Sequence, residues 1–225
     1  MVFFVHRNVI YSALTLRVKS SGESNREAWF LTAEEGLIRA TVFGGPKSKL
    51  RAQVAPFHGG KLWVYHDPVR DSSKVSDFDV QSYRTGIREL YERAMAAAAV
   101  AETVLAFQGG GGGWAEAAKL AGSVLDALEG ADAAACSRIA VYFLWHWADI
   151  LGLRPDLSAN GERQNHGDIR LDSGALRWLN AIESLPAKEI VRVSLDPASL
   201  EQAKTLSTAV LAGELGRKLQ SWDGI

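Results

Sequence analysis

Cysteine is nearly absent from this chain, whose 225 residues include a single one, Cys136. One thiol cannot form an intrachain disulfide, and it excludes metal sites built from several cysteines. Long hydrophobic runs are missing too. Only residues 2–5 are apolar before His6, too few for a signal peptide, and no later run approaches the roughly 20 residues of a membrane-spanning helix. We therefore expect a cytoplasmic protein without membrane contact.

An excess of charge of one sign is also missing. The chain has 25 Lys and Arg against 26 Asp and Glu, a net charge of -1, whereas dedicated nucleic-acid binders are often strongly basic. Its hydrophobic (47%) and charged (23%) fractions are those of a globular protein, which excludes disordered and fibrous classes. Any nucleic-acid surface must therefore come from local segregation of cations.

Motifs of common catalytic sites are not found in the sequence. It contains no nucleophile elbow, zinc-protease, dinucleotide-binding or phosphate-loop signature, and the glycine run at 109–113 is interpreted as a linker. His146 lies in an apolar segment and is interpreted as a hydrogen-bonded core residue. We therefore expect no enzyme. The carboxylates and histidines considered for a metal or hydrolase site, which match no ligand spacing, are His58, His66, Asp67, Asp77 and Asp79.

The first third of the chain has the alternation of a small β-barrel. Segments 12–19, 37–43, 61–66 and 74–82 alternate with period two, and with 27–32 they make about five strands, the number in an OB-fold. We expect a barrel domain over residues 1–81. The residues predicted to fill its interior are Leu14, Leu16, Val18, Ile38, Ala40, Val42, Leu62, Val64, Phe78 and Val80.

After Ser82 the hydrophobic period becomes helical. Helices are predicted over 84–107, 114–128, 133–151 and 174–185, and a last one follows Asp196, an N-cap before Pro197, and carries Leu219 inward. The sequence thus predicts an α+β protein, with an N-terminal OB-fold barrel followed by an all-helical domain over 82–225.

Basic and aromatic residues alternate on the outward side of the predicted strands. Aromatic rings stack nucleic-acid bases and cations neutralise phosphates, so this pattern favours binding of single-stranded DNA. The alternative is that Phe43 and Trp63 pack against the helical domain. Asp77 and Asp79 also face outward, and we expect them away from this surface because they repel phosphate. The predicted barrel surface consists of Arg17, Lys19, Arg39, Phe43, Lys61, Trp63 and Tyr65.

Two further groups of cations are candidate sites. Lys47, Lys49 and Arg51, here called the basic loop, follow a Gly/Pro turn and are expected to contact DNA; the alternative is a solvated charge cluster. In the helical domain, cations near apolar surface are candidates for binding an acidic peptide of a partner protein. They are Arg138, Arg217 and Lys218; the alternative is that they are solvated helix ends, which is the favoured interpretation for the last two.

Several motifs resemble the RecO family of bacterial recombination mediators. They are A-L-x-L-R at 13–17, G-E-S-N-R at 22–26, L-T-x-E-x-G-L at 31–37, G-x-P-K-S-K-L at 44–50, the L-G-x-x-P corner at 151–155 and G-R-x-L-x-S at 216–221. The resemblance implies single-strand binding, annealing of complementary strands and loading of RecA onto DNA coated by the single-stranded-DNA-binding protein SSB. It implies RecR and SSB as partners and adds Arg26 to the DNA-binding candidates. Whether duplex DNA binds is left open.

The chain departs from the family pattern in two places. Many members carry two Cys-x-x-Cys pairs that form a zinc knuckle, but the corresponding loop 154–174 has no cysteine here, and His166 alone cannot build a tetrahedral site. We therefore predict no zinc. The family's loop also has arginines where this chain has Gly45 and Pro46. The alternative function is therefore an OB-fold interaction module without appreciable DNA binding.

Overall fold

The computed structural model describes residues 8–45, 47–157, 165–166 and 169–225. Its contacts divide the chain into two compact units. The first, the barrel unit, comprises Met1–Arg84 with Trp114–Lys119; the second, the helical unit, comprises Thr85–Gly113 with Leu120–Ile225. Each unit is described by itself.

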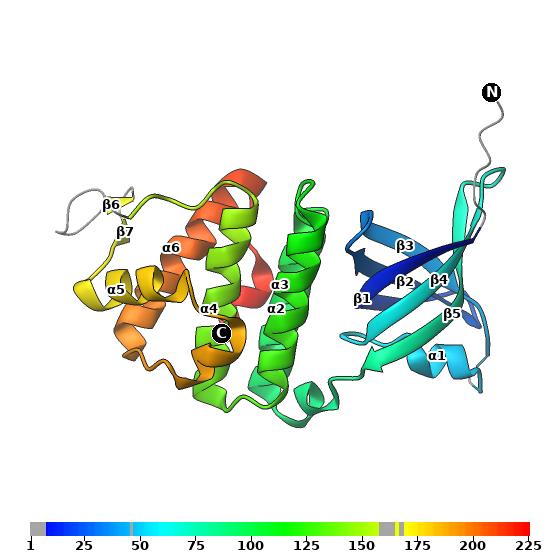
Figure 1. Cartoon of the computed structure of the whole chain (residues 1–225), viewed down its shortest axis with the longest axis horizontal. Coiled ribbons are helices and arrows are strands. Elements are labelled where there is room, and N and C mark those ends of the chain that lie inside the picture. Colours follow the sequence, from blue (N-terminus) through cyan, green and yellow to red (C-terminus); the bar gives the residue numbers. More distant parts are fainter. Residues whose placement is uncertain (1–7, 46, 158–164, 167–168) are drawn as a thin grey trace. The chain divides into compact units, whose positions relative to one another are not determined.

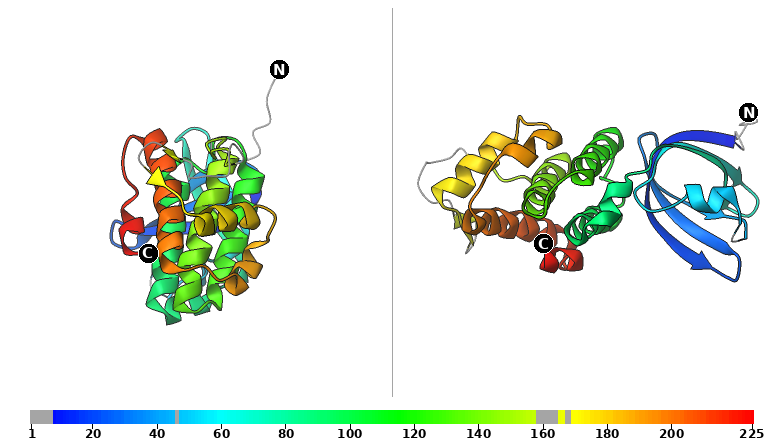
Figure 2. Two further views of the ribbon diagram at one scale, coloured as in Figure 1. Left: turned by 90° about the vertical axis from the view of Figure 1, so that its left-hand side faces the viewer. Right: turned by 90° about the horizontal axis from the view of Figure 1, so that it is seen from below.

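The barrel unit contains five strands that curve around a common interior (Figures 1 and 2). They are β1 (Asn8–Ser21), β2 (Asn25–Thr32), β3 (Gly36–Val42), β4 (Gly59–Asp67) and β5 (Ser72–Ser82), with the helix α1 (Lys49–Gln53) between β3 and β4. Their order is β1-β2-β3-β5-β4, and the barrel closes through a short parallel contact of β3 and β5 at Thr41 and Lys74. The predicted five-stranded OB-type barrel is confirmed.

Alternate residues of the strands fill the barrel. Phe30 and Phe78 meet edge to face in its interior, with ring centroids 6.1 Å apart, and Leu50 of α1 and Val54, which directly follows α1, belong to the same cluster. Eight of the predicted interior residues belong to this cluster. One is Val18 of β1, and the other seven lie in β3, β4 and β5, where the period-two alternation predicts the inward side chains. These seven are Ile38, Ala40, Val42, Leu62, Val64, Phe78 and Val80.

The prediction for β1 is wrong for Leu14 and Leu16. Thr15 pairs with Phe30 of β2 and Arg17 pairs with Trp29, so Leu16 is the extra residue of a β-bulge. Before the bulge, Tyr11 and Ala13 face the interior, and after it Val18 does. Leu14 and Leu16 are buried, but neither belongs to the interior cluster. The bulge shifts the alternation by one residue, which a search for uniform alternation cannot detect.

The helical unit contains the predicted helices, with changed ends. After the short 3-10 helix η1 (Thr85–Glu89), the main helices are α2 (Tyr91–Ala106), α3 (Trp114–Glu129, shared between the units), α4 (Ala133–Ile150), α5 (Ser173–Ile182) and α6 (Pro197–Leu215). The smaller elements are β6 (Asn165–His166), β7 (Ile169–Arg170) and the 3-10 helices η2 (Ala187–Arg192) and η3 (Gln220–Gly224). The helix predicted over 84–107 is interrupted at Leu90, whose backbone is extended (φ -132°, ψ 134°).

Helix α4 is the buried centre of this unit and packs against both α2 and α6 (Figure 1). Trp145 and Trp147 are fully buried on it, which confirms that its apolar residues form a core. The Nε2 atom of His146 lies 3.1 Å from the carbonyl oxygen of Ile182, so the predicted hydrogen bond of this histidine is present. Burial lowers the pKa of His146 and favours its neutral form.

Two aspartates begin neighbouring helices and share one serine. Asp196 caps α6 by accepting a hydrogen bond from the backbone N–H of Ser199 (2.9 Å), as predicted from the Asp-Pro pair. Asp172 caps α5 through the N–H of Ala175 (2.7 Å) and also accepts from the Ser199 hydroxyl (2.9 Å). The start of α5 is thereby tied to the start of α6. Leu219 is buried, as predicted, but it does not belong to the last helix, because α6 ends at Leu215.

We predict that Asp172→Ala lowers the free energy of unfolding by about 1 kcal/mol, the usual cost of removing an N-cap. Hydrogen bonds from Ala175 and Ser199 lower the pKa of Asp172. The charged carboxylate therefore stabilises the fold above its ordinary pKa of about 3.9, and this contribution is lost as pH falls further. Asp172→Asn keeps the acceptor and serves as control. Urea titrations at several pH values should show near-native stability for Asp172→Asn with less acid sensitivity; equal losses in both variants would contradict the capping role.

Candidate nucleic-acid interface

Trp29 lies on the outside of the barrel among three cations. On β2 it stands opposite Arg17 of β1 and Arg39 of β3. The guanidinium carbon of Arg17 is 5.8 Å from the centroid of the Trp29 ring, and the Nζ atom of Lys19 is 5.7 Å from it. These distances are typical of cation–π contacts. Trp29, Arg17, Lys19 and Arg39 are here called the Trp29 cluster.

Trp29 is not among the DNA-binding residues predicted from the sequence, although the sequence contains a signal for it. Phe30 is an obvious interior residue of β2, and period-two alternation then turns its neighbour Trp29 outward. Which cations lie beside Trp29 depends on strand register, which a single sequence does not contain.

One carboxylate borders the Trp29 cluster. Glu27 lies opposite Lys19, and its Oε1 atom is 3.3 Å from the Nε atom of Arg39. The side chain of Arg39 is nevertheless 65% exposed, and exposed ion pairs contribute little because water and salt screen them. Arg39 thus remains accessible to a phosphate.

The aspartates of β5 lie beside Lys61 and Trp63, contrary to the prediction that they lie away from the predicted barrel surface. In the β4–β5 pair, Lys61 stands opposite Asp79 and Trp63 opposite Asp77. Directly opposite residues share one face of a sheet, so these carboxylates counter the positive charge there. Lys61 and Trp63 therefore lie on an electrostatically mixed surface, whereas Arg17, Lys19 and Arg39 gather around Trp29.

Tyr65 has a basic partner instead. Lys74 of β5 lies opposite Tyr65, and its Nζ atom is 4.7 Å from the centroid of that ring. Lys74 also pairs with Thr41 of β3 at the parallel seam. A groove of about 600 Å³ follows the seam, and both Phe43 and Tyr65 line it. The ring of Phe43 is 52% exposed and therefore is not buried in a core.

The basic loop lies partly in α1. Lys47 and Lys49 are exposed, Arg51 is half-buried, and Pro46 lies outside the described residues. The Nη1 atom of Arg26 donates a hydrogen bond to the carbonyl oxygen of Arg51 (3.2 Å), so Arg26 fastens β2 to α1. Burial, together with the charge of Arg51, lowers the pKa of Arg26. Of these four cations, Lys47 and Lys49 are the most available to a ligand.

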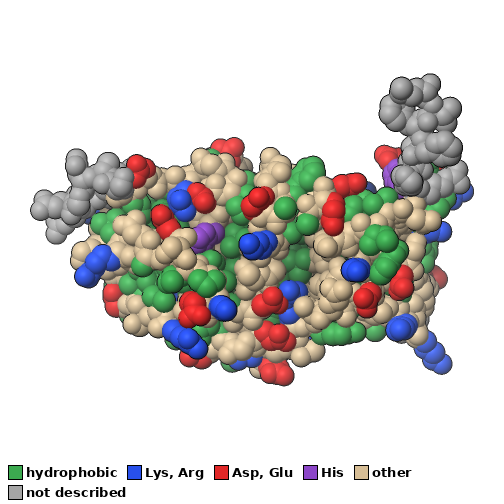
Figure 3. Space-filling model, in the orientation of Figure 1, with side chains coloured by type: hydrophobic (Ala, Val, Ile, Leu, Met, Phe, Trp, Pro, Cys, Tyr) green, Lys and Arg blue, Asp and Glu red, His purple; other side chains and the backbone are tan. Residues whose placement is uncertain are grey.

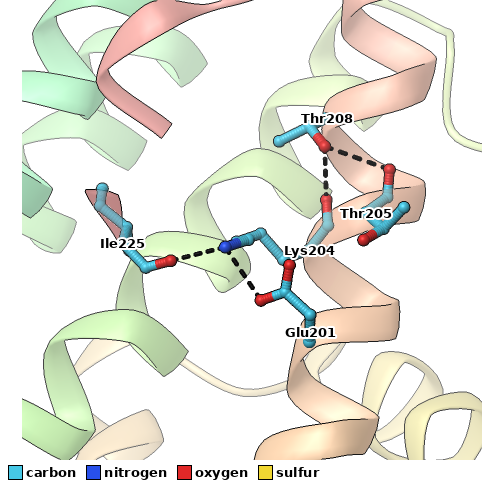
Figure 4. A network of polar contacts seen from close by, with 5 residues as sticks. All are labelled: Glu201, Lys204, Thr205, Thr208 and Ile225. Carbon is cyan, nitrogen blue, oxygen red and sulfur yellow. Dashed lines mark hydrogen bonds and ion pairs between the residues drawn. The ribbon is translucent and has the colours of Figure 1, made fainter. Parts of the chain in front are cut away.

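The predicted cations of the helical unit have different environments. Arg138 is half-buried, and its Nη2 atom donates to the carbonyl oxygen of Val191 (3.2 Å). Arg217 and Lys218 are exposed after the end of α6. Lys218 lines a hollow of about 380 Å³ together with Leu219, Trp222 and Lys204. Figure 4 shows that the Nζ atom of Lys204 contacts both the carboxylate of Glu201 (2.9 Å) and the backbone oxygen of Ile225 (2.6 Å).

Among the residues that the structure describes, no set fits a tetrahedral zinc site. Cys136, the only thiol, is buried in α4, where burial raises its pKa to about 11 and disfavours the thiolate that binds metal. No three potential ligands gather in the described part of the chain. Residues 158–164 and 167–168 of the loop that corresponds to the family's zinc knuckle lie outside the described residues.

Charges of both signs are interspersed over the face seen in Figure 3, as the near-zero net charge suggests. Among the helices that the structure describes, none is long and apolar enough to cross a membrane.

Comparison with known families supports the resemblance of the barrel to the RecO family. Residues 7–83 match the family model described as Recombination protein O N terminal. The matched range contains all five strands and α1, and it ends before the helical unit begins at Thr85. No curated protein matches the chain in sequence.

Proposed function

Because the chain belongs to the RecO family of DNA recombination and repair proteins, we propose that it binds single-stranded DNA on the outside of its barrel. In this proposal it acts as a recombination mediator that anneals complementary strands and helps to load RecA onto SSB-coated DNA. It would do so by binding and presenting strands, without catalysing a reaction of its own.

The Trp29 cluster is the observation that carries this proposal. Stacking of a base on an aromatic ring contributes roughly 1 to 3 kcal/mol, and cations beside the ring neutralise the adjoining phosphates. Trp29, Arg17 and Arg39 sit on three neighbouring strands of one closed barrel, so hydrogen bonding of the sheet holds them in place before a ligand arrives. A preformed site loses little entropy on binding.

Electrostatics limits the expected affinity. If the Trp29 cluster and the basic loop neutralise about four phosphates, the slope of log affinity against log salt should be near -3, at about -0.7 per phosphate for single strands. Binding should therefore be clear at low salt and weak at high salt.

We predict that Trp29→Ala lowers the affinity for an oligothymidylate by about 5- to 140-fold, from loss of roughly 1 to 3 kcal/mol of stacking, and leaves the salt slope unchanged. The double change of Arg17 and Lys19 to Ala should instead flatten the slope by about 1.4, at about 0.7 for each lost phosphate contact. Fluorescence anisotropy over a salt series measures both, and Trp29→Phe, which keeps an aromatic ring, is the control.

Two results of the same titration decide between alternatives. If replacing Lys47, Lys49 and Arg51 together leaves the slope of log affinity against log salt unchanged, the basic loop does not belong to the DNA site. If the unaltered chain binds no oligonucleotide at low salt, the proposal fails in favour of an interaction module that recruits partners without appreciable DNA binding.

We also propose that the protein needs no zinc, unlike family members that have a zinc knuckle. Purified without chelator, it should contain far less than one equivalent of zinc by elemental analysis, and chelator should leave its melting temperature unchanged because, in this proposal, no bound metal contributes to folding. One full equivalent of zinc that survives dialysis would contradict this prediction.

For partners, we propose RecR and SSB, and we assign an acidic peptide of SSB to the helical unit. The hollow beside Lys218 supports this assignment, since the exposed cation lies there beside apolar side chains that are at least partly accessible, Ala209 and Ala212. Lys218→Ala should weaken binding of an acidic peptide that ends in an apolar residue by about three- to tenfold, as expected for a charge-assisted contact of roughly 1 kcal/mol, measured by calorimetry. Lys188→Ala, which removes another exposed lysine, is the control; equal effects would mean non-specific attraction.

A further inference from the structure

The groove at the β3–β5 seam combines an exposed ring with two exposed cations. Phe43 lines it where the chain leaves β3, Tyr65 lines it from β4, and Lys74 and Arg70 contribute positive charge from β5 and the preceding turn. Its volume of about 600 Å³ is within the range of roughly 300 to 1,000 Å³ that is typical of small-molecule sites.

The charge of the groove favours an anion. Arg70 and Lys74 are opposed by one carboxylate, Asp67, for a net charge of +1. The Asp67 carboxylate already accepts the backbone N–H groups of Val69 (3.0 Å) and Arg70 (3.3 Å), which hold the β4–β5 turn. Its contact with the Arg70 guanidinium is long, at 4.0 Å, and the Arg70 side chain is 83% exposed. Both cations are therefore accessible to a phosphate.

The two aromatic rings that line the groove differ in whether a cation already contacts them. Lys74 already covers the ring of Tyr65, with 4.7 Å between its Nζ atom and the ring centroid, which fixes the ammonium group at the groove wall. Phe43 has no such partner among the ring contacts of the described residues, and 52% of it is exposed. The groove is thus lined by one open aromatic ring and two cations.

We propose that this groove binds one unstacked nucleotide of the DNA strand, with its base against Phe43 and its phosphate against Lys74 and Arg70. This inference rests on the proposed function and extends it to the choice between DNA forms. A duplex keeps its bases stacked and paired, so only a single strand places a base on Phe43. The groove therefore favours single-stranded over duplex DNA through this base, while the cations of the Trp29 cluster and of the basic loop attract both forms through phosphate.

The test compares Phe43→Ala with the unaltered chain on two probes of about the same length, an oligothymidylate and a blunt duplex, by fluorescence anisotropy. Loss of one stacked base should lower the affinity for oligothymidylate about 5- to 140-fold and leave duplex affinity within about twofold. Lys74→Ala should flatten the single-strand salt slope by about 0.7, whereas Lys74→Arg should not.

Three controls separate the groove from the rest of the surface. Phe43→Tyr keeps a stacking ring and should bind like the unaltered chain. Val69→Ala removes a residue that is 89% exposed on the neighbouring turn, outside the residues lining the groove, and should have no effect. Melting temperatures should match across the series, because Phe43 is exposed and belongs to no core cluster.

The outcomes distinguish failure of the inference from failure of the proposed function. If Trp29→Ala weakens oligothymidylate binding and Phe43→Ala does not, the groove is not a nucleotide site, and the proposed function stands. If Phe43→Ala weakens binding of duplex and single strand equally, the groove does not select single strands. If the unaltered chain binds neither probe at low salt, both proposals are overturned.

Discussion

The bulge at Leu16 is the constraint on which the barrel surface depends. Thr15 pairs with the interior residue Phe30, so uninterrupted alternation would next turn Arg17 inward. Burying an unpaired guanidinium group in an apolar interior costs far more than a bulge. One extra residue in β1 returns Val18 to the interior and leaves Arg17 and Lys19 outside. The Trp29 cluster exists because of this shift.

The strand register also decides which charges lie beside the outward aromatic residues of β4. Trp63 and Tyr65 are two residues apart and face the same side, yet the first stands opposite Asp77 and the second opposite Lys74. A second bulge, where the register shifts between Trp63 and Val64, produces this difference, since it adds a residue to β5. A chain of almost zero net charge can in this way separate basic from acidic surface within a few strand positions.

The helical unit depends on local chemistry as well as on packing. Asp196 and Asp172 begin α6 and α5, and Ser199 donates its backbone N–H to one and its hydroxyl to the other. This arrangement fixes where α5 starts after the cysteine-free loop, in which many relatives place zinc ligands. In this chain, the two hydrogen-bonded caps fix that start.

The sequence by itself determined the fold class, the five strands, the main helices, the Asp196 cap and the family motifs, because each depends on short-range patterns of period, capping and turn residues. It also identified most cations and aromatics of the barrel surface. Tertiary structure decided that Leu14 and Leu16 lie outside the interior, that Trp29 belongs with Arg17, and that Asp77 lies beside Trp63. The physical reason is that a bulge or a one-residue change of register reverses which face a side chain occupies, and the energy that selects it comes from residues on other strands.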